Sequence, residues 1–548
     1  MGERSLSVRY GMKREDLKRD WRLYRLNRQI ANNVHPKPSN PTVGFFVASA
    51  RLSGISLNAA YAYLTACGLQ VAGHPVAYFA CNAGMSRCVL GTNWQNPSQS
   101  PPCAACVSRS RWLYAHAPTV DFSFEEDKVL RELIDQLDVD ELVEFTHPAT
   151  KEMGDIGDLP LGEIVLPSLR WATRQHTLRD DEQTRFLFRE YILSAWQVAV
   201  EFSKFLVKIE PQIMVLFNGV LYPEATVRWL ALKNNLRVIT HEVGFKPFSG
   251  FFSDQQATAY QVDIPENFSL SIEQNQDLDD YLGQRFKGKF TMAGIQFWPE
   301  MRQMDEEFLR KADQYKQIVP VFTNVIFDTS QIHANTVFDT MFSWLDMVYE
   351  IILTHPETLF VIRAHPDELR SGKQSRESVP GWIEQNEVEQ LPNVVFIGPN
   401  EYLSSYELIL RSKFVMVYNS SIGLEAALMG KVVLCGGKAR YTQYEIVTFP
   451  QTPDEYHRKA EEFLSAEGVL ELPENKLKNA RNFMYYQQFK ASLPFDDFLE
   501  EHTQPGYVRF KPFSWRQLKA ENSLTMKVLI DGIVHDKPFL LNGTEIDA

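Results

Sequence analysis

The first half of the chain alternates short, continuous apolar runs with longer stretches in which apolar residues recur at helical spacing. Continuous apolar runs are typical of strands covered by helices on both faces, whereas strands with one wet face alternate apolar and polar residues. The pattern predicts strands over 42–48, 76–80, 213–217 and 237–240, and helices over 56–69, 126–144, 188–209 and 224–234. A loop over 49–54 joins the first strand to its helix. We interpret this half as a parallel α/β domain.

A second series of the same kind begins near Ile318. It predicts strands over 319–323, 359–363, 394–397, 414–417 and 432–434, with helices over 337–352 and 422–429. The predicted fold class is therefore α/β, with two Rossmann-like domains that face a cleft, as in GT-B-type enzymes. Ligands of such sheets bind at the carboxyl ends of the strands.

The pattern also predicts the boundaries of the domains. We expect a basic helical extension, an N-terminal Rossmann-like acceptor domain with a cysteine-rich insertion, a helical connector, a C-terminal Rossmann-like nucleotide-sugar domain, and a return segment with a tail. These cover residues 1–40, 41–265 with the insertion 81–106, 266–317, 318–490 and 491–548. In the tail, the apolar run 528–530 before Asp531-Gly532 suggests a small hairpin.

Charge is distributed unevenly along the chain. The 548 residues carry a net charge of −13, which argues against nucleic acid as a partner. Residues 1–40 nevertheless carry +6, with apolar residues among the charges. This extension could lie on an anionic membrane surface as an amphipathic helix, or it could pack on the main body. Neither a signal peptide nor a membrane span is apparent, so we expect a cytoplasmic protein, with contact at the inner face of the cell membrane through residues 1–40.

Two strand ends of the second series carry residues that suit a phosphate. Ser420 and Ser421 stand between a buried strand and a helix start, where N–H groups and hydroxyls can hold an anion. Glu425, one turn later, could accept from ribose hydroxyls. The alternative is an ordinary helix cap. Arg363 and His365 follow another strand, where they could contact a nucleotide phosphate or assist a leaving group.

These motifs together resemble the capsule polysaccharide biosynthesis proteins. The resemblance rests on Thr323-Asn324 with Asp328, on the stretch from Arg363 to Glu368, and on Ser420-Ser421-Ile422-Gly423-Leu424-Glu425 and the residues after it. Members of that family are GT-B-type glycosyltransferases, some of which transfer Kdo from its CMP-activated form. The His-Pro and Ser-Ser pairs also resemble those of bacterial sialyltransferases that use CMP-sialic acid.

The resemblance implies roles for individual residues. His365, Ser420 and Ser421 would bind the nucleotide phosphate, Glu425 would bind the ribose, and Asn324 and Gly423 would belong to the same nucleotide-sugar site. The implied function is transfer of a sugar from a nucleotide-activated donor, plausibly CMP-linked, to a surface polysaccharide or lipid-linked glycan. We expect no metal-binding Asp-x-Asp motif at the site, which favours metal-independent transfer. Alternatives on the same fold are a nucleotide-sugar epimerase, a glycerophosphotransferase, or a non-catalytic glycan- or nucleotide-binding member of an assembly complex.

A catalytic base is expected from the first domain. Glu242 follows a strand and stands two residues before Gly244, a spacing that resembles the base of the sialyltransferases. A shielded carboxylate can have its pKa raised and accept the proton of an acceptor hydroxyl. The alternative is an ion pair between Glu242 and Lys246. In the second domain, Lys438 and Arg440 follow Gly436-Gly437 and could bind a donor carboxylate or phosphate, or form a basic surface turn.

Four of the six cysteines fall in one segment. Cys81, Cys88, Cys103 and Cys106 could hold a structural zinc ion, with Cys103 and Cys106 at the tight spacing of a zinc ribbon. Buried unpaired thiols and an iron–sulfur cluster are the alternatives. Cys67 and Cys435 are expected to be core residues.

Overall fold

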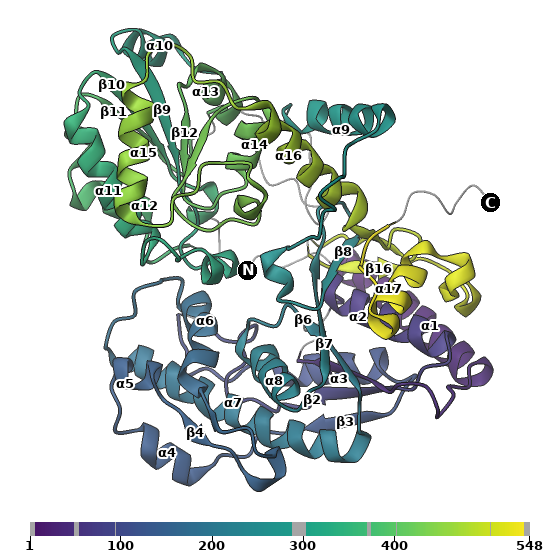
Figure 1. The fold of residues 1–548 in the computed structure, drawn as a ribbon. Coiled ribbons are helices and arrows are strands. Elements are labelled where there is room, and N and C mark those ends of the chain that lie inside the picture. The colour runs from purple at the N-terminus through teal and green to yellow at the C-terminus, as the bar shows by residue number, and fades with distance from the viewer. Residues whose placement is uncertain are drawn as a thin grey trace.

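The computed structural model describes residues 6–48, 54–93, 95–287, 303–369, 374–401, 403–504 and 506–541, and the side chains of the first helix from Asp20 onward. The loop predicted over 49–54 lies mostly outside the described residues, as does the middle of the predicted connector. Two β/α bodies are stacked one above the other (Figure 1). Both Rossmann-like domains predicted from the sequence are thereby confirmed.

The first domain is built on a seven-stranded sheet of order β14-β8-β7-β6-β1-β2-β3. Its strands are β1 (Val43–Val47), β2 (Val76–Cys81), β3 (Thr119–Phe122), β6 (Ile213–Phe217), β7 (Arg237–Val243), β8 (Ser249–Ser253) and β14 (Leu493–Pro494). The pairs from β7 to β3 are parallel, whereas β8 and β14 add an antiparallel edge. Because β7 also pairs with β8, it continues three residues beyond the predicted end and includes Glu242.

Helices cover both faces of this sheet. They are α2 (Leu57–Val71), α3 (Cys103–Leu113), α4 (Lys128–Ile134), α5 (Val139–Val143), α6 (Leu161–Thr173), α7 (Glu182–Ile209) and α8 (Tyr222–Lys233), with a small β4–β5 pair (His147–Pro148, Asp158–Leu159). The single helix predicted over 126–144 is wrong. It forms two short helices because Asp138 starts α5 with a capping box to Glu141.

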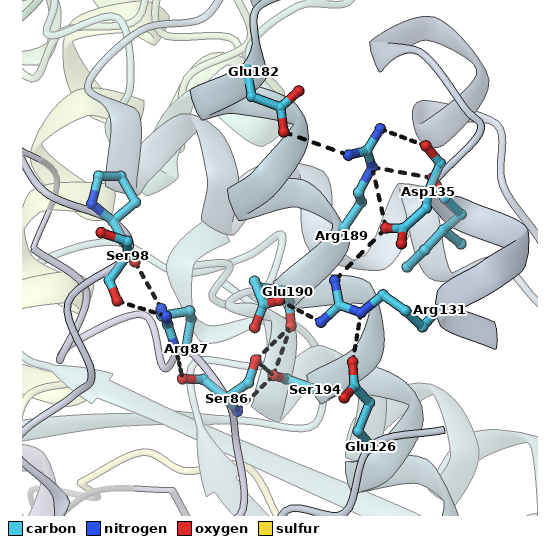
Figure 2. Close-up of polar contacts among 12 residues, drawn as sticks. Ser86, Arg87, Ser98, Glu126, Arg131, Asp135, Glu182, Arg189, Glu190 and Ser194 are labelled. Carbon is cyan, nitrogen blue, oxygen red and sulfur yellow. Dashed lines mark hydrogen bonds and ion pairs between the residues drawn. The ribbon is translucent and has the colours of Figure 1, made fainter. Parts of the chain in front are cut away.

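Polar contacts fasten the segment between β2 and α5 to the long helix α7 (Figure 2). Arg131 of α4 bridges Glu190 of α7 at 2.5 Å and Glu126 at 2.6 Å. Arg189 of α7 donates to the carbonyls that end α4, including that of Ile134 at 3.1 Å. The backbone N–H of Ser86 donates to the Ser194 hydroxyl of α7 at 3.1 Å. The cysteine-bearing segment is therefore anchored at its β2 end.

The second domain has a five-stranded, fully parallel sheet of order β11-β10-β9-β12-β13. Its strands are β9 (Gln317–Phe322), β10 (Thr358–Arg363), β11 (Val394–Ile397), β12 (Val415–Val417) and β13 (Val433–Cys435), each within about two residues of its prediction. The surrounding helices are α10 (Glu306–Ala312), α11 (Met341–Thr354), α12 (Val379–Gln385), α13 (Ser405–Arg411), α14 (Ile422–Leu428) and α15 (Pro453–Ser465).

Two further helices belong to the stretches of chain that connect the domains, α9 (Ile272–Arg285) before the second domain and α16 (Glu474–Tyr485) after it. In Figure 1, α9 lies beside the second domain and α16 leads from it toward the first. The chain then returns to the first domain and adds β14, the β15–β16 pair (Leu499–Glu501, Val508–Phe510) and α17 (Leu524–His535). The hairpin predicted near Asp531 is wrong, because this segment is the helix α17. Gly532 does not turn the chain there. It leaves room for Phe539, whose ring would stand 2.4 Å from a Cβ at that position.

The basic extension forms helix α1 (Leu6–Asn33), which packs on the first domain. Leu23, Leu26 and Ile30 are buried in its hydrophobic core. The described apolar face of α1 thus packs on the protein. Of the two possibilities left open by the sequence, this agrees with a helix packed on the main body. Among the described helices, none is long and apolar enough to cross a membrane.

Candidate active site

Glu242 lies near the carboxyl end of β7, at the boundary between the domains. The Oε1 atom of Glu242 accepts from the Asn58 side chain of α2 at 3.2 Å and from the N–H of Val243 at 2.8 Å. Ser56 caps α2 and so fixes the first turn that presents Asn58. Asn218, which follows the neighbouring strand β6, also hydrogen-bonds the Glu242 carboxyl. Adjacent strand ends therefore position this carboxyl, as predicted for a parallel sheet.

The surroundings of Glu242 shift its pKa in the direction a base needs. Burial raises the pKa of Glu242 to about 7, the Asp328 carboxyl adds to the rise, and the hydrogen bonds from Val243, Asn58 and Asn218 oppose it. The alternative of an ion pair with Lys246 does not occur, because the Lys246 ammonium lies 4.0 Å from the centre of the Phe489 ring. The neighbouring His241 stays neutral, since burial lowers its pKa to about 3.

Asp328 connects Glu242 to the second domain. It is exposed, follows β9, and begins the 3-10 turn over Thr329–His333. The Asp328 carboxylate also raises the pKa of His365, although burial lowers it overall. His365 Nδ1 accepts the N–H of Asp367 at 3.2 Å, so a neutral His365 carries its proton on Nε2. The two predicted catalytic residues, one from each domain, thus share one electrostatic neighbour.

Ser420 and Ser421 lie between β12 and α14. Ser421 is the N-cap residue of α14, and its side chain makes no capping hydrogen bond. The Ser420 carbonyl accepts the Tyr441 hydroxyl at 2.6 Å. Gly423 is required by this packing, since a Cβ there would stand 2.3 Å from the Tyr441 oxygen. Phosphate binding by the two serines stays a prediction.

Glu425 does not have the open position that a ribose contact needs. It is 3% exposed, and its Oε1 accepts from Arg285 of α9 at 2.7 Å while its Oε2 accepts from the Tyr406 hydroxyl at 2.5 Å. The pKa of Arg285 is raised by this partner despite burial. The structure therefore shows Glu425 tying the connector helix to α14. Arg285 gives no signal in the sequence as a partner of Glu425, because the two residues are 140 positions apart in the chain.

Arg363 and Asn324 also make contacts within the second domain. The Arg363 guanidinium is buried and donates to the carbonyl of Leu403. Asn324 Oδ1 accepts the N–H of Asn419 at 3.3 Å and so joins the ends of β9 and β12. Both contacts fit a structural role. Contact of Arg363 and Asn324 with a nucleotide stays a prediction.

Lys438 and Arg440 differ from each other. Lys438 is exposed, whereas the Arg440 guanidinium lies 4.5 Å from the centre of the Phe245 ring of the first domain. Burial lowers the pKa of Arg440, and its Nε has no hydrogen-bond partner. Arg440 is thus a cation at the domain boundary rather than part of a surface turn.

The four clustered cysteines lie near one another. Burial raises the pKa of Cys81 to about 12, and the thiols of Cys88, Cys106 and Cys103 add to the rise. Within the described ranges, no three His, Cys, Asp or Glu side chains are arranged to hold a metal ion. The structural zinc stays a prediction. Cys67 and Cys435 are core residues, as predicted.

The chain contains two Asp-x-Asp sequences, Asp138-Val139-Asp140 and Asp277-Leu278-Asp279. Asp138 of the first caps α5, and Asp279 of the second pairs with Arg481 at 2.8 Å. Asp138 belongs to the first domain, on the segment fastened to α7, and Asp279 to the connector helix α9. Neither lies at a strand end beside Glu242 or His365.

Comparison with known proteins matches residues 274–467 to the capsule polysaccharide biosynthesis protein family, which confirms the predicted resemblance for this part of the chain. Protein FixF of Sinorhizobium fredii is 32% identical over 107 residues, which is 20% of this chain and 23% of FixF. The chain thus spans less than a quarter of that relative.

Several solved structures are similar in part. The beta Kdo 2,4 transferase KpsC of Thermosulfurimonas dismutans has 12% identity, covers 50% of this chain and 79% of its own, and gives a TM-score of 0.33. The UDP-GlcNAc 2-epimerase of Neisseria meningitidis has 11% identity, covers 81% of this chain and 99% of its own, and gives a TM-score of 0.24.

Proposed function

We propose, on the premise that residues 274–467 belong to the capsule polysaccharide biosynthesis protein family, that this protein is a glycosyltransferase of capsule synthesis. Its donor is a nucleotide-activated sugar, CMP-linked by the resemblance to enzymes that use CMP-Kdo or CMP-sialic acid. Its acceptor is a surface polysaccharide or a lipid-linked glycan. The observation that carries the proposal is the position of Glu242, with its pKa raised to about 7, at the boundary with the nucleotide-sugar domain.

In the proposed reaction, Glu242 acts as the general base. The acceptor hydroxyl oxygen forms a bond to the anomeric carbon of the donor while Glu242 takes the hydroxyl proton. The bond between the anomeric carbon and the phosphate oxygen breaks, and its electron pair stays on the departing CMP. A base with a pKa near the working pH combines an adequate ionised fraction with adequate proton affinity.

Groups of the second domain stabilise the leaving nucleotide in this scheme. The His365 Nε2–H can donate to a phosphate oxygen, since its Nδ1 is already engaged by Asp367. The hydroxyls of Ser420 and Ser421 add donors, and Lys438 and Arg440 supply positive charge. Donors that are held in place before the reaction stabilise charge that develops as the glycosidic bond breaks. No step requires a metal ion.

Binding of nucleotides tests the proposal. A ligand that binds only the folded chain raises its melting temperature. We expect CMP to stabilise the protein more than UDP or GDP does, and Ser421→Ala to reduce this stabilisation. Incubation with CMP-Kdo and a capsular oligosaccharide acceptor should then release CMP. Absence of stabilisation by every nucleotide would contradict the proposal.

A further inference from the structure

A groove on the first domain has no role in the proposed reaction. It lies between α1 and the segment that follows β16, where the C-terminal return of the chain runs beside the basic extension (Figure 1). Its volume of about 770 Å³ is within the range of small-ligand sites. The residues that line it are not among those that meet at the domain boundary.

The lining combines cations with aromatic rings. The residues used below are Trp21, Arg22, Arg25, Gln29, Lys511 and Phe513. No carboxylate is among the described residues that line the groove, although Glu500 pairs with Arg22 at 3.2 Å from outside it. Arg22 also donates to the carbonyl of Phe510 at 2.6 Å, so it holds α1 against β16.

The two remaining cations are available to a ligand. Within the part of the chain that the structure describes, neither Arg25 nor Lys511 forms an ion pair. The Arg25 guanidinium lies 5.5 Å from the centre of the Trp21 ring, which is 59% exposed. Trp21 and Arg25 therefore present an apolar ring and a positive charge to the same groove.

We propose that this groove binds an acidic glycan chain. Arg25 and Lys511 would hold its carboxylates, the Trp21 and Phe513 rings would pack against the apolar faces of its sugar rings, and Gln29 would reach its hydroxyls. The choice of a glycan among polyanions rests on the proposed function. The groove would hold the polymer at a distance from the reacting end and so raise its local concentration.

A membrane fits this surface less well than a glycan. An interfacial helix buries an apolar face in the lipid, but Leu23, Leu26 and Ile30 of α1 are already buried in the protein core. The site is also a concave groove, whereas a lipid surface requires an exposed, convex contact. In the described part of α1, the exposed large apolar side chains are Trp21 and Tyr24.

The test measures binding of a sialic acid hexamer to the full chain by calorimetry, without nucleotide. We expect binding that weakens with added salt, no comparable binding of neutral maltohexaose, and affinity about fivefold lower in Arg25→Gln and in Lys511→Gln. Trp21→Ala should weaken binding similarly. Arg458→Gln removes an exposed cation on α15 and should change nothing. These side chains are exposed or line a surface groove, so melting temperatures should stay within about one degree of wild type.

The proposal would be overturned if the hexamer did not bind, or if the wild type and the groove variants bound it equally well. It would also be overturned if the variants bound the glycan normally but no longer bound phosphatidylglycerol vesicles. The last result would make the groove a membrane contact. Glu242→Gln should bind the hexamer as tightly as the wild type does. The transferase function is tested separately by the nucleotide measurements, so one proposal can fail without the other.

Discussion

The Glu242 carboxyl of the first domain lies within electrostatic reach of the Asp328 carboxyl of the second, and Asp328 contributes to the raised pKa of Glu242. Two negative charges near each other disfavour ionisation of the more buried one. The proton affinity of Glu242 therefore depends on how the domains are placed relative to each other. A donor that changes this placement would also change the strength of the base.

The pH dependence of transfer follows from this relationship. Glu242 must be ionised to accept a proton, and its pKa is raised to about 7. Activity measured as kcat/KM should thus rise tenfold per pH unit below about 7 and level off above it. In Asp328→Asn one cause of the raised pKa is absent, so the midpoint should move to lower pH. A midpoint near the ordinary value of glutamate in the wild type, or an unchanged midpoint in Asp328→Asn, would contradict the assignment.

Removing one partner of the Arg285–Glu425 pair should destabilise the second domain. The two side chains are 12% and 5% exposed, so Arg285→Ala leaves a buried carboxylate that keeps the hydrogen bond from Tyr406 but has lost its ion-pair partner. The expected loss is about 3–5 kcal/mol, seen in calorimetry as a lower melting temperature. Arg458→Ala removes an exposed arginine from α15 and serves as the control, with a change below about 0.5 kcal/mol. Equal melting temperatures for the two variants would show that the pair does not stabilise the domain.

Gly423→Ala tests the packing at the start of α14. The added Cβ would stand 2.3 Å from the Tyr441 oxygen and 3.0 Å from Val417 Cγ2, so the helix start must shift. We expect a loss of about 1–3 kcal/mol and weaker stabilisation by CMP. Gly283→Ala is the matched control, because it lies in helix α9 with no atom within 4 Å of the new Cβ. Alanine there should stabilise the helix slightly.

Much of the fold is predictable because parallel strands and their covering helices have distinct hydrophobic patterns. The missed elements depend on distant residues. β8 is a short strand that adds to the edge of the first sheet, and β14 pairs with it from more than 240 residues further along the chain. The segment before Asp531-Gly532 resembled a hairpin, yet Leu529 and Ile533 recur at helical spacing and Ser523 caps the helix.

For the candidate site, the sequence predicts the residues at strand ends but not their partners from distant parts of the chain. Glu242 and His365 could be placed because each comes just after the end of a predicted strand. Asn58 gave no sequence signal, because its contact with Glu242 depends on how α2 packs beside β7. The ion pair between Glu425 and Arg285 could not be predicted either, because it depends on how α9 packs against α14. The resemblance implied that Glu425 binds a ribose, whereas in the structure its carboxylate is engaged by Arg285.

Metal analysis tests the predicted structural zinc. Protein purified without chelator should contain about one equivalent of zinc, and Cys103→Ser should lower this amount. A thiol must lose its proton to bind zinc, and the pKa of Cys81 is raised. Zinc binding should therefore weaken as the pH falls. Cys435→Ser alters a cysteine of the other domain and is the control. A metal-free wild-type protein would contradict the prediction.

The most direct test of the proposed transferase is Glu242→Gln, measured for both CMP release from CMP-Kdo and stabilisation by CMP. The substitution keeps the shape and the contact with Asn58 but removes the base. We expect a rate at least about 100-fold lower with unchanged stabilisation by CMP. Transfer at the wild-type rate by Glu242→Gln would contradict this expectation.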